Sequence, residues 1–71
     1  MKFTAEELFN LAYAEYLDAD FLPDRGSAEW HSWKEGVGEW ALASSQDEFI
    51  SKDAVREELR GYIAEEKAAR E

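Results

Sequence analysis

Four acidic side chains near the first turn of the chain have the spacing of a calcium-binding loop. Positions 1, 3, 7 and 12 of a twelve-residue window are held by Asp18, Asp20, Asp24 and Glu29. An EF-hand takes its oxygen ligands from such positions and ends in a bidentate glutamate. Two requirements of that loop fail, because Leu22 stands where an oxygen ligand is needed and Pro23 stands where the turn needs glycine. We therefore expect an acidic helix end followed by a turn, with no metal bound.

The single histidine, His31, is the most reactive candidate for catalysis. His31 and Glu35 are four residues apart and would share one helix face, but two ligands do not make a closed metal site. A histidine base also needs a positioned nucleophile. Ser27 and Ser32 are better explained as a helix cap and a helix-surface residue. We expect no catalytic residue, no metal and no cofactor, and we expect that the chain is not an enzyme.

A basic ridge lies along the last predicted helix, where Lys52, Arg56 and Arg60 recur every four residues. Such a ridge is typical of phosphate contacts. Three acidic residues lie between these cations, however, and the chain as a whole has a net charge of −9. Because nucleic-acid binding needs several uncompensated cations, we expect no direct contact with nucleic acid.

The acidic residues are concentrated in the first part of the chain. Residues 1–51 hold 11 carboxylates and 3 bases, whereas residues 52–71 hold 6 carboxylates and 5 bases. This distribution repels nucleic acid and anionic membranes and attracts a basic protein surface. We expect the partner to be bound by the acids of the first two helices and of the corner between them: Glu6, Glu7, Asp18, Asp20, Asp24, Glu35 and Glu39.

The acidic surface has two interpretations. Solubility alone explains a net charge of magnitude about 2–8 in a small domain, and this chain lies just beyond that range. Alternatively, carboxylates on rigid helices imitate a row of phosphates. In composition the chain resembles the small, acidic, cysteine-free inhibitors that are common among phage proteins. The favoured hypothesis is a protein-binding module that inhibits a nucleic-acid-binding protein. The runner-up is a self-associating regulatory or assembly protein, a homodimer formed through Leu11, Leu17 and Leu42.

The first predicted helix begins at a capping box, in which Thr4 and Glu7 satisfy each other's backbone amides. Apolar residues then recur on one helical face. Pro23 and the turn residues that follow it end the helix near residues 19–22. Its expected core face consists of Leu8, Phe9, Ala12, Tyr13 and Tyr16.

The second predicted helix is capped by Ser27. Its apolar stripe contains Trp30, Trp33 and Trp40, which we expect at the centre of the core. The sequence Gly36-Val37-Gly38 interrupts the pattern, since each helical glycine costs about 1 kcal/mol relative to alanine. We expect a kink, a break or a close approach by another helix at this point. A short strand over residues 37–42 is the alternative.

The last part of the chain holds two further helix starts. Ser45 and Glu48 have capping-box spacing, which predicts a short extra turn over residues 46–50. Ser51 then caps a final helix, whose buried stripe we expect to be Val55, Leu59, Tyr62 and Ile63. Because Glu66 falls on the same stripe, residues 64–71 are expected to project into water or fray.

The sequence therefore predicts a small all-α domain of three helices, with a short extra helical turn between the second and third, over residues 1–71. Ten aromatic residues supply a core for so short a chain. Cysteine is absent, which favours a reducing compartment. No stretch is long and apolar enough to span a membrane. We therefore expect a cytoplasmic protein.

Overall fold

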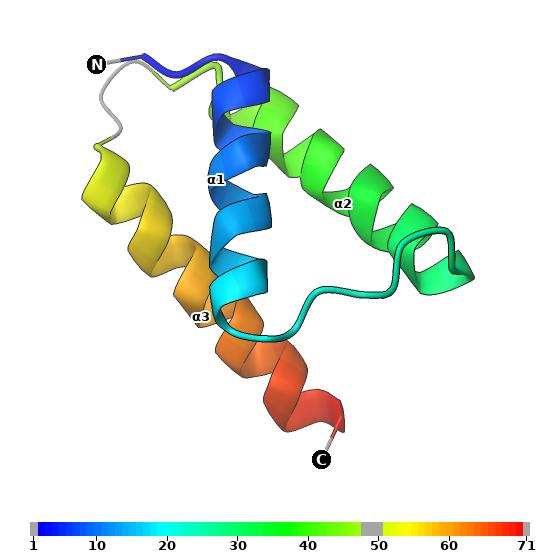
Figure 1. Cartoon of the computed structure of the whole chain (residues 1–71). Coiled ribbons are helices and arrows are strands. Elements are labelled where there is room, and N and C mark those ends of the chain that lie inside the picture. The colour runs from blue at the N-terminus through cyan, green and yellow to red at the C-terminus, as the bar shows by residue number, and fades with distance from the viewer. Residues whose placement is uncertain (1, 48–50, 71) are drawn as a thin grey trace.

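Three α-helices form the described part of the protein. The computed structural model describes residues 2–47 and 51–70, and within them the helices are α1 (Ala5–Asp18), α2 (Ala28–Ser44) and α3 (Lys52–Arg70) (Figure 1). These two ranges contain no strand. The predicted all-α, three-helix class is confirmed. Most of the predicted extra turn falls on residues 48–50, which lie outside the described residues.

The helix starts follow the sequence signals. Thr4 and Glu7 form a complete capping box, with both hydrogen bonds at 3.1 Å. The Ser27 hydroxyl accepts from the Trp30 amide, also at 3.1 Å, and so caps α2. Ser51 accepts from the amide of Ala54 at the start of α3. Each hydroxyl or carboxylate satisfies backbone amides that have no partner inside the helix, and this fixes where each helix begins.

The expectations for the middle of the chain are partly wrong. Helix α2 runs unbroken through Gly36 and Gly38, so neither the break nor the strand over residues 37–42 forms. Ser45 is the C-cap of α2 and donates its hydroxyl proton to the Leu42 carbonyl. The strong helix formers around the glycines keep α2 continuous despite their cost.

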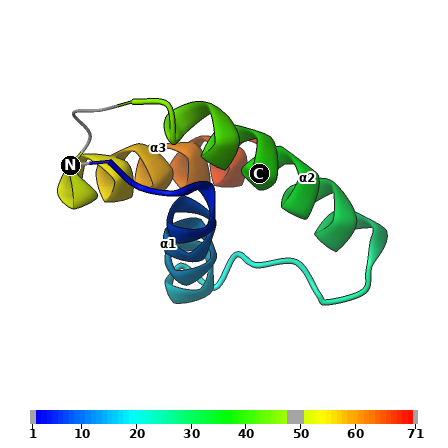
Figure 2. The ribbon, with the colours of Figure 1, turned by 90° about the horizontal axis from the view of Figure 1, so that it is seen from above.

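Helix α1 is the centre of the fold. It packs against both α2 and α3, whereas among the described residues no Cα atom of α2 lies within 8 Å of one in α3. Figure 2 shows α1 on one side of the layer formed by the other two helices. The hydrophobic core therefore follows α1, and α2 and α3 meet each other only through side chains, at Trp40–Glu58 and Glu29–Arg70 among the described residues.

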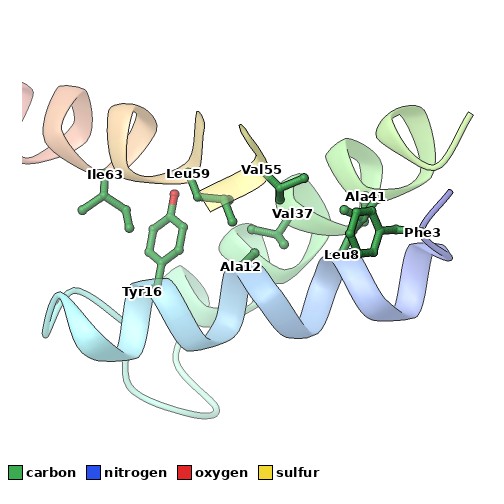
Figure 3. Close-up of a cluster of buried hydrophobic side chains, with 9 residues drawn as sticks. All are labelled: Phe3, Leu8, Ala12, Tyr16, Val37, Ala41, Val55, Leu59 and Ile63. Carbon is green, nitrogen blue, oxygen red and sulfur yellow. The ribbon is translucent and has the colours of Figure 1, made fainter. Parts of the chain in front are cut away.

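The core is small and consists mainly of aliphatic residues. Leu8, Leu59 and Val55 are its largest fully buried side chains (Figure 3). The stripe predicted for α3 is confirmed for Val55, Leu59 and Ile63, but Tyr62 remains 42% exposed. The nine buried hydrophobic residues are Phe3, Leu8, Ala12, Tyr16, Val37, Ala41, Val55, Leu59 and Ile63.

The three tryptophans are not at the core centre, and that prediction is wrong. Trp30, Trp33 and Trp40 are all half-buried, and the buried residues of α2 are Val37 and Ala41. Trp30 and Trp33 contact aromatic rings of α1 on one side only, and within the described residues no Cα atom of α3 comes within 8 Å of α2 to cover the other side. The apolar stripe of α2 exists as predicted, but only the part that contains Val37 and Ala41 is fully buried against α1.

The end of α3 is exposed, as predicted, but it remains helical as far as Arg70. Its side chains reach other elements. Lys67 donates to the Ala19 carbonyl at 3.0 Å, and Arg70 lies 3.9 Å from a carboxylate oxygen of Glu29. Among the described residues, no helix is long and apolar enough to cross a membrane.

Candidate functional site

The seven acidic residues predicted to bind a partner are all exposed, but they do not form one face. Glu6 and Glu7 lie in the first turn of α1, and Asp18 ends the same helix, about 18 Å away at 1.5 Å per residue. Asp20 and Asp24 follow in the loop. The remaining two, Glu35 and Glu39, lie on successive turns of α2. The structure thus divides the acidic residues into three groups.

The acidic loop does not gather into a metal site. No three His, Asp or Glu side chains come together as metal ligands anywhere in residues 2–47 or 51–70. Asp20 adopts a left-handed conformation with φ of 54°, and its amide donates to the Leu17 carbonyl, which closes the end of α1. Gly26, with φ of 85°, completes the turn before α2. The loop residues therefore serve to reverse the chain.

Four of the five basic side chains of α3 contact other groups within the molecule. Arg56 and Arg60 lie 3.6 and 3.5 Å from the two carboxylate oxygens of Glu15, whose side chain is 10% exposed. Lys67 and Arg70 stack over the ring of Phe21, at 5.5 and 5.0 Å from its centroid. These cations hold α3 against α1 and the loop, and two of the three members of the predicted basic ridge, Arg56 and Arg60, are paired with Glu15.

The main concave feature is a groove between α2 and α3. It consists of two adjoining hollows of about 520 and 430 Å³ that share Ser32, Trp33 and Glu66. Tyr16 reaches into it from α1 and forms part of its floor. We call this feature the α2–α3 groove. Its outer end contains Phe21 and Arg70, and its inner end contains Trp40 and Tyr62.

Aromatic rings form the floor and one wall of the α2–α3 groove. Trp33 makes edge-to-face contacts with Phe9 and Tyr16, at centroid distances of 5.8 and 5.3 Å, and stacks on Trp30 at 5.2 Å. Such pairs each contribute about 0.5–1.5 kcal/mol beyond buried area. The indole N–H of Trp33 is buried and finds no acceptor within the part of the chain that the structure describes. The rings therefore form a rigid aromatic surface.

Two carboxylates bind tyrosine hydroxyls along the groove. The Tyr16 hydroxyl donates to Glu66 at 3.3 Å, and burial together with this negative charge raises the pKa of Tyr16 to about 12. Glu58 accepts from the Tyr62 hydroxyl at 2.8 Å and from the Trp40 indole at 3.1 Å. The hydrogen bond to Glu58 also raises the pKa of Tyr62. Glu58 thereby joins α2 and α3 across the inner end of the groove.

The rim of the α2–α3 groove is acidic. Glu35 and Glu39 each lie three residues beyond a groove residue of α2, so they neighbour it on the helix surface. Glu65 bears the same relation to Tyr62 on α3 and raises its pKa further. Glu58 is the fourth carboxylate of the rim, and all four are exposed. We call Glu35, Glu39, Glu58 and Glu65 the groove rim.

Sequence reasoning identified two of the four rim residues and missed the groove. Glu35 and Glu39 were expected to contact a partner, whereas Glu58, Glu65 and the aromatic floor were not. One related signal was present: Gly36 and Gly38 weaken the centre of α2, and they predicted a kink, a break or a close approach by another helix. Within the described structure nothing approaches it, because a Cβ placed on Gly36 would meet no atom within 4 Å.

The leucines proposed for a dimer do not form one patch. Leu17 and Leu42 are 56% and 61% exposed. They lie in the last turns of α1 and α2, which end at opposite ends of the molecule (Figure 1). Leu11 is half-buried against the core. A dimer built on these leucines would therefore use separate contacts.

No family model, no curated protein and no solved structure matches this chain at a significant level.

Proposed function

We propose that this protein is a non-enzymatic binding module for a protein with a basic surface, and that a nucleic-acid-binding protein is its partner. The observation that carries the proposal is that most cations of α3 have partners within the molecule, whereas most acids of α1, α2 and their loop are exposed. Four of the five cations of α3, all except Lys52, contact Glu15, Glu29, Phe21 or the Ala19 carbonyl. Apart from Glu15, the acids of α1, α2 and their loop are exposed, so a strongly negative surface faces any partner.

The density of charge supports competition with nucleic acid. The molecule is 34 Å long and has a net charge of −9, or about one net charge per 4 Å. A single DNA strand carries one charge per roughly 3.4 Å, and a duplex about twice as many. Averaged over its length, the molecule therefore carries nearly as much negative charge as one strand, although its acids are divided into three groups. Inhibition by occupying the partner's lysine- and arginine-lined groove is the mechanism that we propose.

The test begins with partner capture and proceeds to salt dependence. The immobilised chain is challenged with an extract of its own source, and the affinity of each retained protein is measured at rising salt. We expect affinity to fall steeply as salt rises, because screening weakens exposed charge pairs. Duplex DNA or RNA should displace the partner. A partner that binds equally well in high salt, or together with nucleic acid on the same surface, contradicts mimicry.

Charge reversal supplies the matched control. The double variant Glu35→Lys/Glu39→Lys should bind more weakly and with a smaller salt dependence than the original chain. The double variant Asp53→Lys/Glu57→Lys changes the net charge equally, at the same four-residue spacing, on α3. Both of its positions are exposed and neither belongs to the groove rim. We expect this control to lose much less affinity. Equal losses would mean that net charge alone, rather than a defined surface, governs binding.

Self-association remains the second candidate, because Leu17 and Leu42 are the most exposed large apolar side chains of the described residues. Their separation and the charge of −9 on each copy both oppose a dimer. A homodimer would resist salt or tighten with it, the reverse of the behaviour expected for a basic partner.

A further inference from the structure

The α2–α3 groove is long enough to receive a short helix. Along α2 it extends from Ala28 to Trp40, which is about 18 Å at 1.5 Å per residue. That length matches about three helical turns. Because α1 covers only one side of α2 and α3, their adjoining faces are left without a helical neighbour. In such grooves an amphipathic helix lays its apolar face against the floor.

The wall formed by α2 leaves room for close approach. Ser32 and Gly36 line the groove on successive turns, and the space beside Gly36 is open. Glycine at this position destabilises α2 by about 1 kcal/mol relative to alanine. No contact within the described chain makes use of its small size. A helix lying in the groove would do so, since glycine lets a backbone approach closely.

The charges around the groove identify the kind of helix that fits. Four carboxylates form the groove rim, and Glu66 lies inside the groove. Arg70 is the cation among the groove residues, and it is already beside Glu29. An apolar helix with lysines or arginines along both flanks would meet these carboxylates. A second copy of this chain would bring further negative charge to an acidic rim, so it is the poorer occupant.

We propose that the α2–α3 groove receives a basic amphipathic helix of about three turns, belonging to the partner protein. The apolar face of that helix packs on Trp33, Trp40 and Tyr62, and its basic flanks pair with the groove rim. This inference rests on the proposed function, since it places the contact with the basic partner in the groove. It assigns the contact to α2 and α3 rather than to the acidic ends of α1.

The test uses designed peptides as probes and follows them by amide NMR and tryptophan fluorescence. The first probe is a side-chain-stapled helix of about 12 residues, with leucines on one face and lysines on the flanks. The second has the same composition in scrambled order, and the third carries glutamate in place of lysine. We expect the first probe to bind at least about tenfold more tightly than the other two. It should shift the amides of Ser32, Gly36, Tyr62 and Glu66.

Two glycine variants separate the groove from the surface as a whole. Gly36→Gln places a side chain in the groove, whereas Gly61→Gln makes the same change on α3 outside it. Neither changes the net charge, and both replace glycine by a good helix former. Gly36→Gln should weaken binding of the first probe by about tenfold, and Gly61→Gln should leave it within about twofold.

The outcomes distinguish this inference from the proposed function. If the scrambled probe binds equally well, or Gly36→Gln has no effect while Glu35→Lys/Glu39→Lys weakens binding, the groove is not the seat and the basic-partner proposal survives. If no basic probe and no basic protein binds, both proposals fail. Sedimentation of the chain alone covers the remaining occupant: a dimer that Gly36→Gln abolishes would assign the groove to a second copy and overturn the inference.

Discussion

Helix α3 takes part in two contacts of opposite character. Toward α1 it buries Val55, Leu59 and Ile63 in an aliphatic core that excludes water. Toward α2 it presents Tyr62 and Glu66, which line an open groove and reach their neighbours through hydrogen bonds. The two contacts lie on adjoining faces of one helix, yet the first resembles a protein interior and the second resembles an unoccupied interface.

The difference shows how a chain of 71 residues can both fold and retain a binding surface. The apolar area around α1 provides the stability, because buried aliphatic side chains contribute about 1.5–3 kcal/mol each. The groove residues are held in place by α1 from beneath, through Tyr16 and the aromatic contacts of Trp33. Changes in the groove should therefore affect binding far more than folding, and changes beneath it should do the reverse.

Truncating a side chain in the contact between α1 and α3 should lower the free energy of unfolding more than any other change considered. Leu59→Ala removes a side chain that is 2% exposed, and such truncations cost about 2–5 kcal/mol. Tyr62→Ala, one turn along on the groove side, should cost only about 1 kcal/mol because its ring is 42% exposed. Urea unfolding followed by circular dichroism measures both values. Similar losses for the two variants would mean that the groove is part of the stabilising core.

The second prediction concerns Tyr16, which belongs to both regions. Its folded pKa of about 12 exceeds the ordinary value of 10.0, so the neutral hydroxyl is favoured in the folded state. The resulting stability is fully present below pH 10 and is lost as the pH rises toward 12. The free energy of unfolding should fall in that range, and Tyr16→Phe should make the fall shallower. A variant with the same alkaline slope as the original chain would contradict the raised pKa of Tyr16.

Much of the fold could be predicted from local sequence signals. The caps at Thr4, Ser27 and Ser51 depend on residues within one turn, and so does the apolar spacing of α3. Such signals need no knowledge of the rest of the chain. They correctly predicted three helices, where each begins, and the buried positions Val55 and Leu59.

The burial of the tryptophans and the groove could not be predicted in this way. Periodicity shows that Trp33 and Trp40 share a face of α2, but not how many helices cover that face. The answer depends on the separation of α2 and α3, which is set by how each packs on α1. Glu58 and Glu65 appeared to be ordinary surface acids for the same reason. Their relation to Tyr62 and Trp40 exists only once the helices are assembled.

Two helical glycines, one inside the groove and one outside it, should show a smaller change in the free energy of unfolding. Gly36→Ala and Gly61→Ala should each raise the free energy of unfolding by about 0.5–1 kcal/mol. In both cases the added methyl group meets no atom within 4 Å, and the helix loses a flexible residue. Thermal unfolding of the two variants gives the comparison. If Gly36→Ala destabilised the domain while Gly61→Ala stabilised it, the groove wall would be packed in the free protein and could not admit a helix.

The smallest expected effect concerns the exposed leucines. Leu17→Ser and Leu42→Ser should each change stability by less than about 0.5 kcal/mol, because both side chains lie mostly in water. The sedimentation coefficient of the original chain should not change with protein concentration, and neither substitution should alter it. A dimer that dissociates in either variant would replace the groove with a leucine contact as the main interface. It would also show that repulsion between two chains of charge −9 is overcome by apolar contacts at the helix ends.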